Sequence, residues 1–95
     1  MKLVVAATPS VALPTIEALL KNHEVTIVTQ PDKVAGRGKQ MRASDVGLAY
    51  PQSLKPESET ELVEILQGND LLITIGYGRI LKMSTLTIPK HGGIN

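Results

Sequence analysis

The feature that most constrains the fold of this 95-residue chain is a pair of short apolar runs separated by a helical segment. The runs are Leu3–Ala7 and Val25–Val28, and between them Ile16, Leu19 and Leu20 recur at helical spacing. Uninterrupted apolar runs of this length are typical of buried strands. Because parallel strands need a long crossover connection, usually a helix, residues 1–28 predict a right-handed βαβ unit.

The rest of the chain extends this pattern. Ser58 and Glu61 form a capping box, which predicts a helix over about Glu59–Gln67, and "LLITI" at 71–75 predicts a third buried strand. The stretch Thr29–Asp45 has no periodicity and is expected to be a loop. We also expect a short strand at 48–50, a short helix at about 81–86, and the first residues of another strand in "GGIN". The fold class is α/β: part of an open, mostly parallel sheet with helices on both faces.

Composition limits the chemistry. There is no Cys, which excludes disulfides, thiolate metal sites and Cys nucleophiles. Aromatic residues make up 2% of the chain, so the core must consist of aliphatic side chains. The apolar run within the start "MKLVVAATPS" is too short for a signal peptide or a membrane span. We therefore expect a cytoplasmic protein without membrane contact.

Positive charge is concentrated in one stretch. Residues 30–42 contain four cations and one anion, whereas the whole chain has a net charge of +1. The cations Lys33, Arg37 and Lys39 surround Gly36 and Gly38, directly after an apolar strand. Taken alone, this stretch fits an ordinary solvated turn, a phosphate cradle or a surface for a polyanion.

Common cofactor motifs are missing from the sequence. The segment after the first strand, "ATPS", lacks the G-x-G-x-x-G fingerprint and the Walker pattern. His23 and His91 are far apart and have no acidic or His neighbour at ligand spacing, so we expect no metal site. The acidic residues around Ser58 suit the first turn of a helix better than catalysis.

Four segments together resemble one family. "VVAATPSVALPTIEALL", "VTIVTQPDKVAGRGKQ", "LLITIGYGRIL" and "GGIN" occur in the order and near the spacing found in methionyl-tRNA formyltransferases. The resemblance implies that residues 1–95 are the amino-terminal portion of a Rossmann-like formyltransferase domain, without the family's carboxy-terminal barrel. It further implies transfer of a formyl group from 10-formyltetrahydrofolate to the amino group of initiator methionyl-tRNA, in a cytoplasmic enzyme that is expected to be a monomer. This piece alone is expected to be inactive.

The resemblance also assigns roles to individual residues. The stretch Gly36, Arg37, Gly38 and Lys39 matches a loop that approaches the tRNA acceptor arm, with Arg37 as the main recognition residue. Arg79, Ile80 and Leu81 match the segment that lines the pterin pocket. Asn95 matches the Asn that opens the family's catalytic motif.

The chain departs from the family in three ways. Ala7 replaces a family Gly, a helix of about ten residues after the cationic stretch is missing or shortened, and the chain stops at Asn95, before the family's catalytic His and Asp. Two alternatives therefore stay open. One is a formyltransferase for a small amino-sugar or nucleotide substrate, and the other is a non-catalytic nucleotide-binding α/β domain.

Overall fold

The strand β1 lies at the centre of the sheet and has a neighbour along each edge. The computed structural model describes residues 1–35, 38 and 40–95. In it the strand order is β2-β1-β5-β6, and each neighbouring pair is parallel. This confirms the open parallel α/β sheet. The strands are β1 (Lys2–Ala7), β2 (Glu24–Val28), β5 (Leu71–Ile75) and β6 (Gly93–Ile94).

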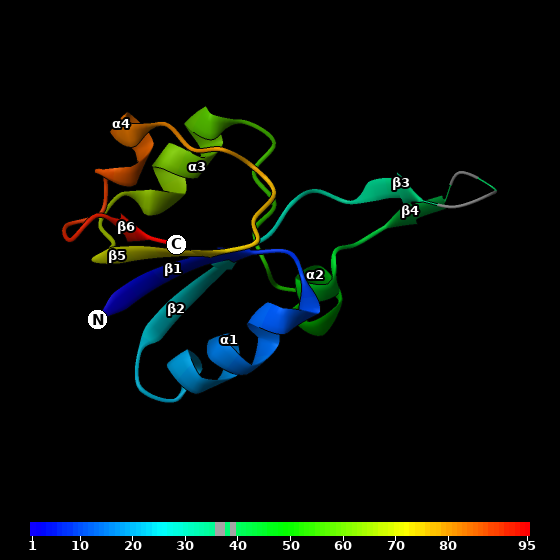
Figure 1. Ribbon diagram of the computed structural model, residues 1–95, viewed down its shortest axis with the longest axis horizontal. Helices are drawn as coiled ribbons and strands as arrows, with labels where there is room; N and C mark the ends of the chain where they lie inside the picture. Colours follow the sequence, from blue (N-terminus) through cyan, green and yellow to red (C-terminus); the bar gives the residue numbers. More distant parts are fainter. Residues whose placement is uncertain (36–37, 39) are drawn as a thin grey trace.

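Helices cover both faces of this sheet (Figure 1). On one face lie α1 (Leu13–Leu20), which a short 3₁₀ turn at Ser10–Ala12 precedes, and α2 (Asp45–Ala49). On the other lie α3 (Glu59–Leu66) and α4 (Met83–Leu86). Because side chains alternate along a strand, Val5 and Ala7 of β1 join the core cluster under α1, while Val4 and Ala6 join the cluster under α3. The Ala7 methyl group is thus buried in the core.

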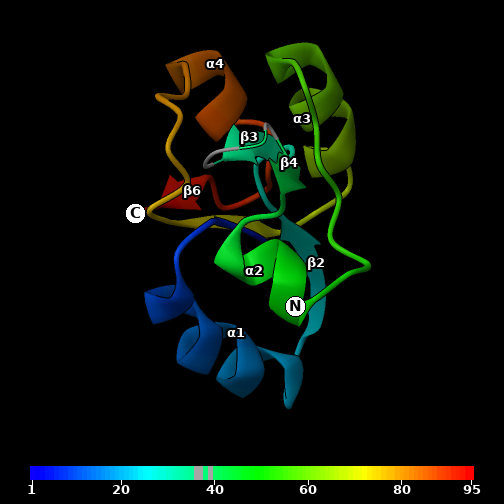
Figure 2. The same cartoon turned by 90° about the vertical axis from the view of Figure 1, so that its right-hand side faces the viewer.

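A β-hairpin projects from the body of the molecule (Figures 1 and 2). Its strands, β3 (Lys33–Ala35) and β4 (Gln40–Arg42), pair antiparallel. The prediction of a loop over Thr29–Asp45 is therefore wrong for these residues. Each strand has three residues, and Val34 and Met41 are exposed, so no buried face produces a periodic pattern in the sequence.

The predicted strand at 48–50 is also wrong, because residues 45–49 form the helix α2. The Ser44 side chain caps this helix by accepting a hydrogen bond from the Gly47 N–H at 3.0 Å. Val46 is fully buried against the sheet, whereas Leu48 is exposed. The helix α2 has five residues.

The predicted capping box at the start of α3 is present in a modified form. Ser58 Oγ accepts from the Glu61 N–H at 3.2 Å, but the Glu61 carboxylate accepts from the Glu57 N–H at 2.7 Å instead of from Ser58. Glu59 reaches the next helix, where it accepts from the Lys82 N–H at 3.0 Å and from Thr85 Oγ1 at 2.9 Å. These hydrogen bonds, the backbone one foremost, lower the pKa of Glu59. The acidic residues therefore act in helix capping and helix docking.

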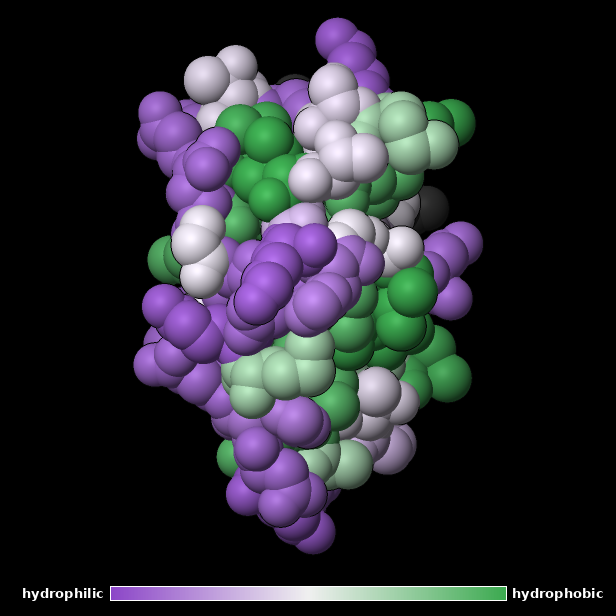
Figure 3. All heavy atoms as spheres, turned by 90° about the vertical axis from the view of Figure 1, so that its left-hand side faces the viewer, coloured by the Kyte–Doolittle hydropathy of each residue, from purple (hydrophilic) through white to green (hydrophobic). Residues whose placement is uncertain are grey.

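The strands β1 and β5 begin at the end of the sheet that lies away from the hairpin (Figure 1). Asp70 Oδ2 accepts from the Lys2 N–H at 2.8 Å, and the Asp70 N–H donates to the Lys2 carbonyl at 2.7 Å. The first of these bonds lowers the pKa of the Asp70 carboxyl group. Figure 3 shows this end of the molecule, with hydrophilic residues gathered across its middle. The hairpin projects from the opposite end of the molecule (Figure 1).

Gly76 ends β5 with a backbone conformation that other residues rarely adopt. Its φ is +56°, and a Cβ atom built there would lie 2.9 Å from Pro9 Cγ. Pro9 comes from the loop after β1, so the two loops are in close contact. Gly68, by contrast, also has a positive φ, +77°, but an added Cβ there would meet nothing within 4 Å.

We expect Gly76→Ala to lower the free energy of unfolding more than Gly68→Ala does. Both substitutions force a side chain into a left-handed conformation, which costs roughly 1–2 kcal/mol, but only Gly76→Ala adds a clash with Pro9, worth about 1–3 kcal/mol more. Urea unfolding of the two variants measures the difference. Equal losses for both variants would show that the contact with Pro9 carries no energy.

Candidate functional site

The loops that follow β1, β2 and β5 meet at one edge of the sheet, because the three strands are parallel. Side chains join these loops across long sequence separations. Thr8 Oγ1 donates to the Gly76 carbonyl at 2.6 Å, and Gln30 Nε2 donates to the Tyr77 carbonyl at 2.9 Å. Ligands of open α/β sheets bind at this edge, beyond the carboxyl ends of the strands. Two cavities are found there among the described residues.

The first cavity, which we call the Asn95 cavity, has a volume of about 320 Å³. It brings together residues that are far apart in the sequence, since Asn95 and the segment Arg79–Leu81 both line it. The side chain of Ile80 is 98% exposed, and that of Leu81 packs partly on the core. The remaining lining residues are Thr74, Leu86, Gly93 and Ile94.

The Asn95 side chain is oriented by its neighbour on β5. Thr74 Oγ1 donates to Asn95 Oδ1 at 2.9 Å. Because Oδ1 is the acceptor, the amide hydrogens on Nδ2 are the groups that a ligand could use, and no described residue accepts from them. An amide donor in a cavity can stabilise negative charge that develops on a ligand oxygen, and it stays uncharged across the physiological pH range.

The second cavity, which we call the hairpin cleft, has a volume of about 250 Å³ and lies at the base of the β3–β4 hairpin. Its polar lining comes from three parts of the chain: Thr8 after β1, Gln30 after β2, and the hairpin with the segment that follows it. Sequence reasoning missed this cleft, although "RAS" followed by an acid is a helix-start signal that could have located one wall. The lining residues are Thr8, Gln30, Pro31, Lys33, Arg42, Ala43, Ser44, Tyr77 and Gly78.

Gln30 contacts residues of both cavities. Its side chain is 9% exposed, donates to the Tyr77 carbonyl and accepts from Arg79 Nη2 at 3.5 Å. Arg79 lines the Asn95 cavity, whereas Gln30 and Tyr77 line the hairpin cleft. One buried amide therefore holds residues of both cavities in position.

Tyr77 is the second buried polar group at this edge. Its side chain is 3% exposed and packs in the core under α3, and burial raises the pKa of its hydroxyl group. The hydroxyl group has no hydrogen-bond partner in the described part of the chain. We assign it a packing role.

The predicted tRNA loop is only partly included in the described residues. Gly36, Arg37 and Lys39 lie outside the described residues. Gly38 is described, is exposed and has a φ of +94°. Across the described ranges, no group of three or more His, Cys, Asp or Glu side chains could hold a metal ion, and no helix has the length and hydrophobicity needed to cross a bilayer.

The fold and the two cavities define an α/β protein with a ligand site at the carboxyl edge of a parallel sheet. Comparison with known proteins narrows this class. The chain is 39% identical over its whole length to a methionyl-tRNA formyltransferase of Clostridium botulinum, and 38% identical over its whole length to one of Streptomyces avermitilis. A methionyl-tRNA formyltransferase of Stenotrophomonas maltophilia is 39% identical over 97% of the chain. No family model matches the chain.

These matches confirm the resemblance that the four sequence segments indicated. The chain spans about a third of the length of the relatives that it matches, 34% for the Clostridium botulinum protein. The aligned stretch with that protein has 105 positions, ten more than this chain has residues. The relatives are enzymes by name, and this chain is similar to part of them.

We expect Gln30→Leu to loosen the loop at residues 76–79 and to destabilise the fold. The substitution leaves the Tyr77 carbonyl without its donor, and an unsatisfied buried polar group costs about 1–3 kcal/mol. Amide hydrogen exchange at residues 76–79 should become faster than in the parent chain. The matched control is Gln52→Leu at an exposed position, and equal exchange in both variants would contradict the role of Gln30.

Proposed function

We propose that this chain is the amino-terminal portion of a formyltransferase domain, whose parent enzyme transfers a formyl group from 10-formyltetrahydrofolate to initiator methionyl-tRNA. The observation that carries the proposal is the Asn95 cavity. Its lining combines the segment that resembles a pterin-binding motif with the residue that resembles a catalytic Asn. The similarity to methionyl-tRNA formyltransferases along the whole chain supports the choice of reaction.

The cavity suits the pterin part of a folate. Ligand cavities in proteins usually measure about 300–1,000 Å³ and combine an apolar lining with a few polar groups. Here Ile80, Leu81, Leu86 and Ile94 supply apolar surface at a volume of about 320 Å³, and the Asn95 amide supplies a polar group. The pterin rings would lie against the aliphatic side chains, and the formyl group, which is bonded to the N10 nitrogen beside the rings, would face Asn95.

In the reaction, the amino group of methionyl-tRNA attacks the formyl carbon. The carbonyl oxygen takes up negative charge as the tetrahedral intermediate forms, and Asn95 Nδ2 donates a hydrogen bond to it. The attacking nitrogen then loses a proton, and the folate nitrogen leaves with the electron pair of the broken C–N bond and takes up a proton. By resemblance, the His and Asp that move these protons follow Asn95 in the parent enzyme.

The hairpin supports the choice of tRNA as the second substrate. It projects from the body of the molecule and carries Lys33 and Arg42 (Figure 1), and the sequence between its strands contains Arg37 and Lys39. A guanidinium group can contact phosphate or a base edge through two parallel hydrogen bonds. We further propose that the parent enzyme is a cytoplasmic monomer that acts in translation initiation.

The proposal is tested in a chimera in which this chain replaces the matching segment of the Clostridium botulinum relative. We expect the chimera to formylate methionyl-tRNA and the isolated 95-residue chain to show no transfer. Asn95→Ala in the chimera should lower kcat by about 10²–10³-fold with a smaller change in KM, because the amide acts on charge that develops during the reaction. Asn22→Ala, at an exposed turn, is the control. A folded chimera without activity would refute the function, and a folded Asn95→Ala variant that keeps its kcat would refute the role of Asn95.

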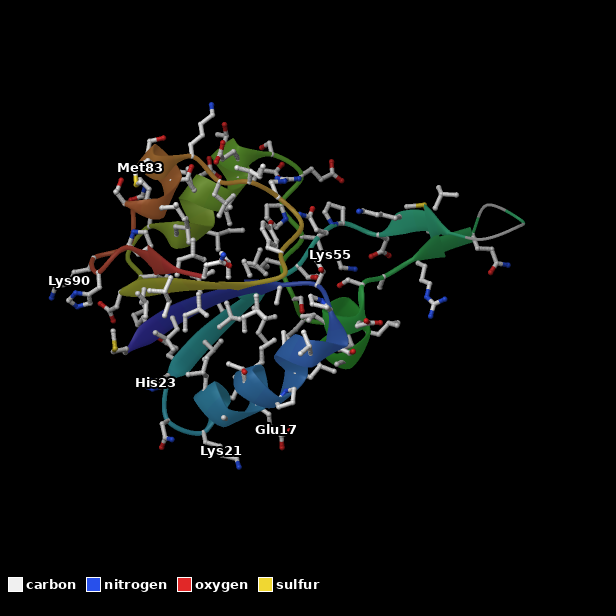
Figure 4. All side chains as sticks on the ribbon, viewed as in Figure 1. Glu17, Lys21, His23, Lys55, Met83 and Lys90 are labelled. Atoms are coloured by element: carbon white, nitrogen blue, oxygen red, sulfur yellow. The ribbon has the colours of Figure 1, made fainter. Side chains whose placement is uncertain are left out.

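Arg37→Ala in the chimera should weaken binding of methionyl-tRNA. The loss of a charge-assisted contact predicts a decrease in kcat/KM equivalent to about 1.5–3 kcal/mol, chiefly through KM. Lys39→Ala should have a smaller effect, since an ammonium group makes a less directional contact. Lys90→Ala is the control, because Lys90 lies at the far end of the molecule from the hairpin (Figure 4). An unchanged KM for Arg37→Ala would mean that Arg37 does not contact methionyl-tRNA.

A further inference from the structure

The helix α4 contributes to one side of the Asn95 cavity. Its last residue, Leu86, lines the cavity together with Gly93 and Asn95. A Cβ atom built on Gly93 would lie 3.2 Å from Leu86 Cδ2, so the helix packs directly on the strand that leads to Asn95. The position of α4 relative to β6 therefore sets the width of the cavity.

This helix has few internal contacts to hold it in place. It consists of four residues, Met83–Leu86, and a single helical turn is not stable by itself in water. Its N-cap residue, Lys82, makes no capping hydrogen bond with its side chain. Met83 is 72% exposed, so this side of the helix faces solvent. The position of α4 therefore depends on contacts with the rest of the chain.

Glu59, the first residue of α3, supplies such a contact. The helices α3 and α4 lie side by side on one face of the sheet (Figures 1 and 2). The Oε1 atom of Glu59 accepts from the Lys82 N–H at 3.0 Å and from Thr85 Oγ1 at 2.9 Å. It thus caps the first turn of α4, where a carboxylate is favoured by the helix dipole. Within the described residues, these are the only hydrogen bonds that join residues 82–86 to another helix or strand.

The burial of Thr85 makes the contact with Glu59 costly to lose. The Thr85 side chain is 2% exposed, and its hydroxyl group donates to the Glu59 carboxylate. Without this acceptor the hydroxyl group would stay buried and unpaired, unless α4 moved far enough for water to reach it. Loss of the carboxylate therefore favours a displaced α4.

From these contacts we propose that Glu59 is a positioning residue for the Asn95 cavity: it holds α4 against β6 and so determines how tightly the cavity binds its ligand. Glu59 is not among the lining residues, so it acts through α4 and not by contact with the ligand. That the ligand is the pterin part of 10-formyltetrahydrofolate rests on the proposed function. Asn95 is oriented by Thr74, so the loss of Glu59 should affect binding of the folate more than the chemical step.

The test is the affinity of the chimera for 10-formyltetrahydrofolate, measured by calorimetry without methionyl-tRNA so that no transfer occurs. Glu59→Ala should raise the dissociation constant by roughly 3–10-fold, because a wall that is in place in about a third to a tenth of the molecules lowers the apparent affinity by the same factor. Glu59→Gln should keep most of the affinity, since its amide oxygen can accept from the same two donors. Glu64→Ala, which removes an exposed carboxylate from the same helix, should leave the dissociation constant unchanged.

Kinetics and hydrogen exchange separate this role from a general loss of stability. In the chimera, Glu59→Ala should raise KM for 10-formyltetrahydrofolate but not for methionyl-tRNA, and kcat should stay within about twofold. In the 95-residue chain, amide exchange at residues 82–88 should become faster, while exchange in β1 and β2 stays the same. Thr85→Val removes one of the two hydrogen bonds. It is the milder variant if Glu59→Ala does not fold, and it should raise the dissociation constant by a smaller factor.

An unchanged dissociation constant for a folded Glu59→Ala variant would overturn the proposal, as would an equal increase for Glu64→Ala or an equal rise in KM for both substrates. An active chimera with unchanged folate binding in Glu59→Ala would remove the role of Glu59 alone. A chimera that shows the altered folate affinity but transfers no formyl group would support the role of Glu59 and refute the proposed reaction. A chimera that binds no folate would overturn both, and faster exchange at residues 82–88 would then show that Glu59 only stabilises α4.

Discussion

The arrangement depends on β1 being paired along both edges and covered on both faces. Backbone N–H and C=O groups in the interior must be hydrogen-bonded, and β2 and β5 satisfy those of β1 in parallel register, with Lys2 opposite Glu24 and Leu3 opposite Leu71. Parallel pairing makes the three strands end together. The loops at Thr8, Thr29 and Gly76 therefore meet at one edge, and both cavities follow from this pairing.

The elements that sequence reasoning predicted correctly are those with a strong local signal. β1, β2 and β5 are apolar runs, and α3 begins at a Ser cap followed by an acid. The hairpin has no such signal, because its pairing leaves Val34 and Met41 exposed and has no buried face. Sequence reasoning missed α2 because the third residue after its cap, Ser44, is Gly47 instead of the Glu or Gln of a capping box. Only the packing of Val46 on the sheet distinguishes a helix from a strand there.

The candidate site divides in the same way. Asn95 and Arg79–Leu81 could be selected because they resemble motifs of a family, and the structure places both groups on one cavity. Gln30 lies in one of the segments that resemble the family, but no role was assigned to it there, and its hydrogen bond to Tyr77 spans 47 positions, so only the fold reveals that contact. The resemblance predicts a shortened region after the cationic stretch, and the alignment with the Clostridium botulinum relative has ten more positions than this chain has residues. After α2 the chain returns to the sheet through a parallel bridge between Val28 and Leu54.

The hydrogen bonds that Gln30 makes with residues of both cavities have a thermodynamic consequence. The side-chain amide of Gln30 donates to the Tyr77 carbonyl and accepts from Arg79, so a ligand that turns this side chain in the hairpin cleft also removes a hydrogen bond from Arg79, which lines the Asn95 cavity. The occupancies of the two cavities are then linked, and linkage is reciprocal: if filling the first cavity changes the affinity of the second by some factor, filling the second changes the first by the same factor. A substitution of Gln30 that removes both hydrogen bonds would then remove this coupling in both directions.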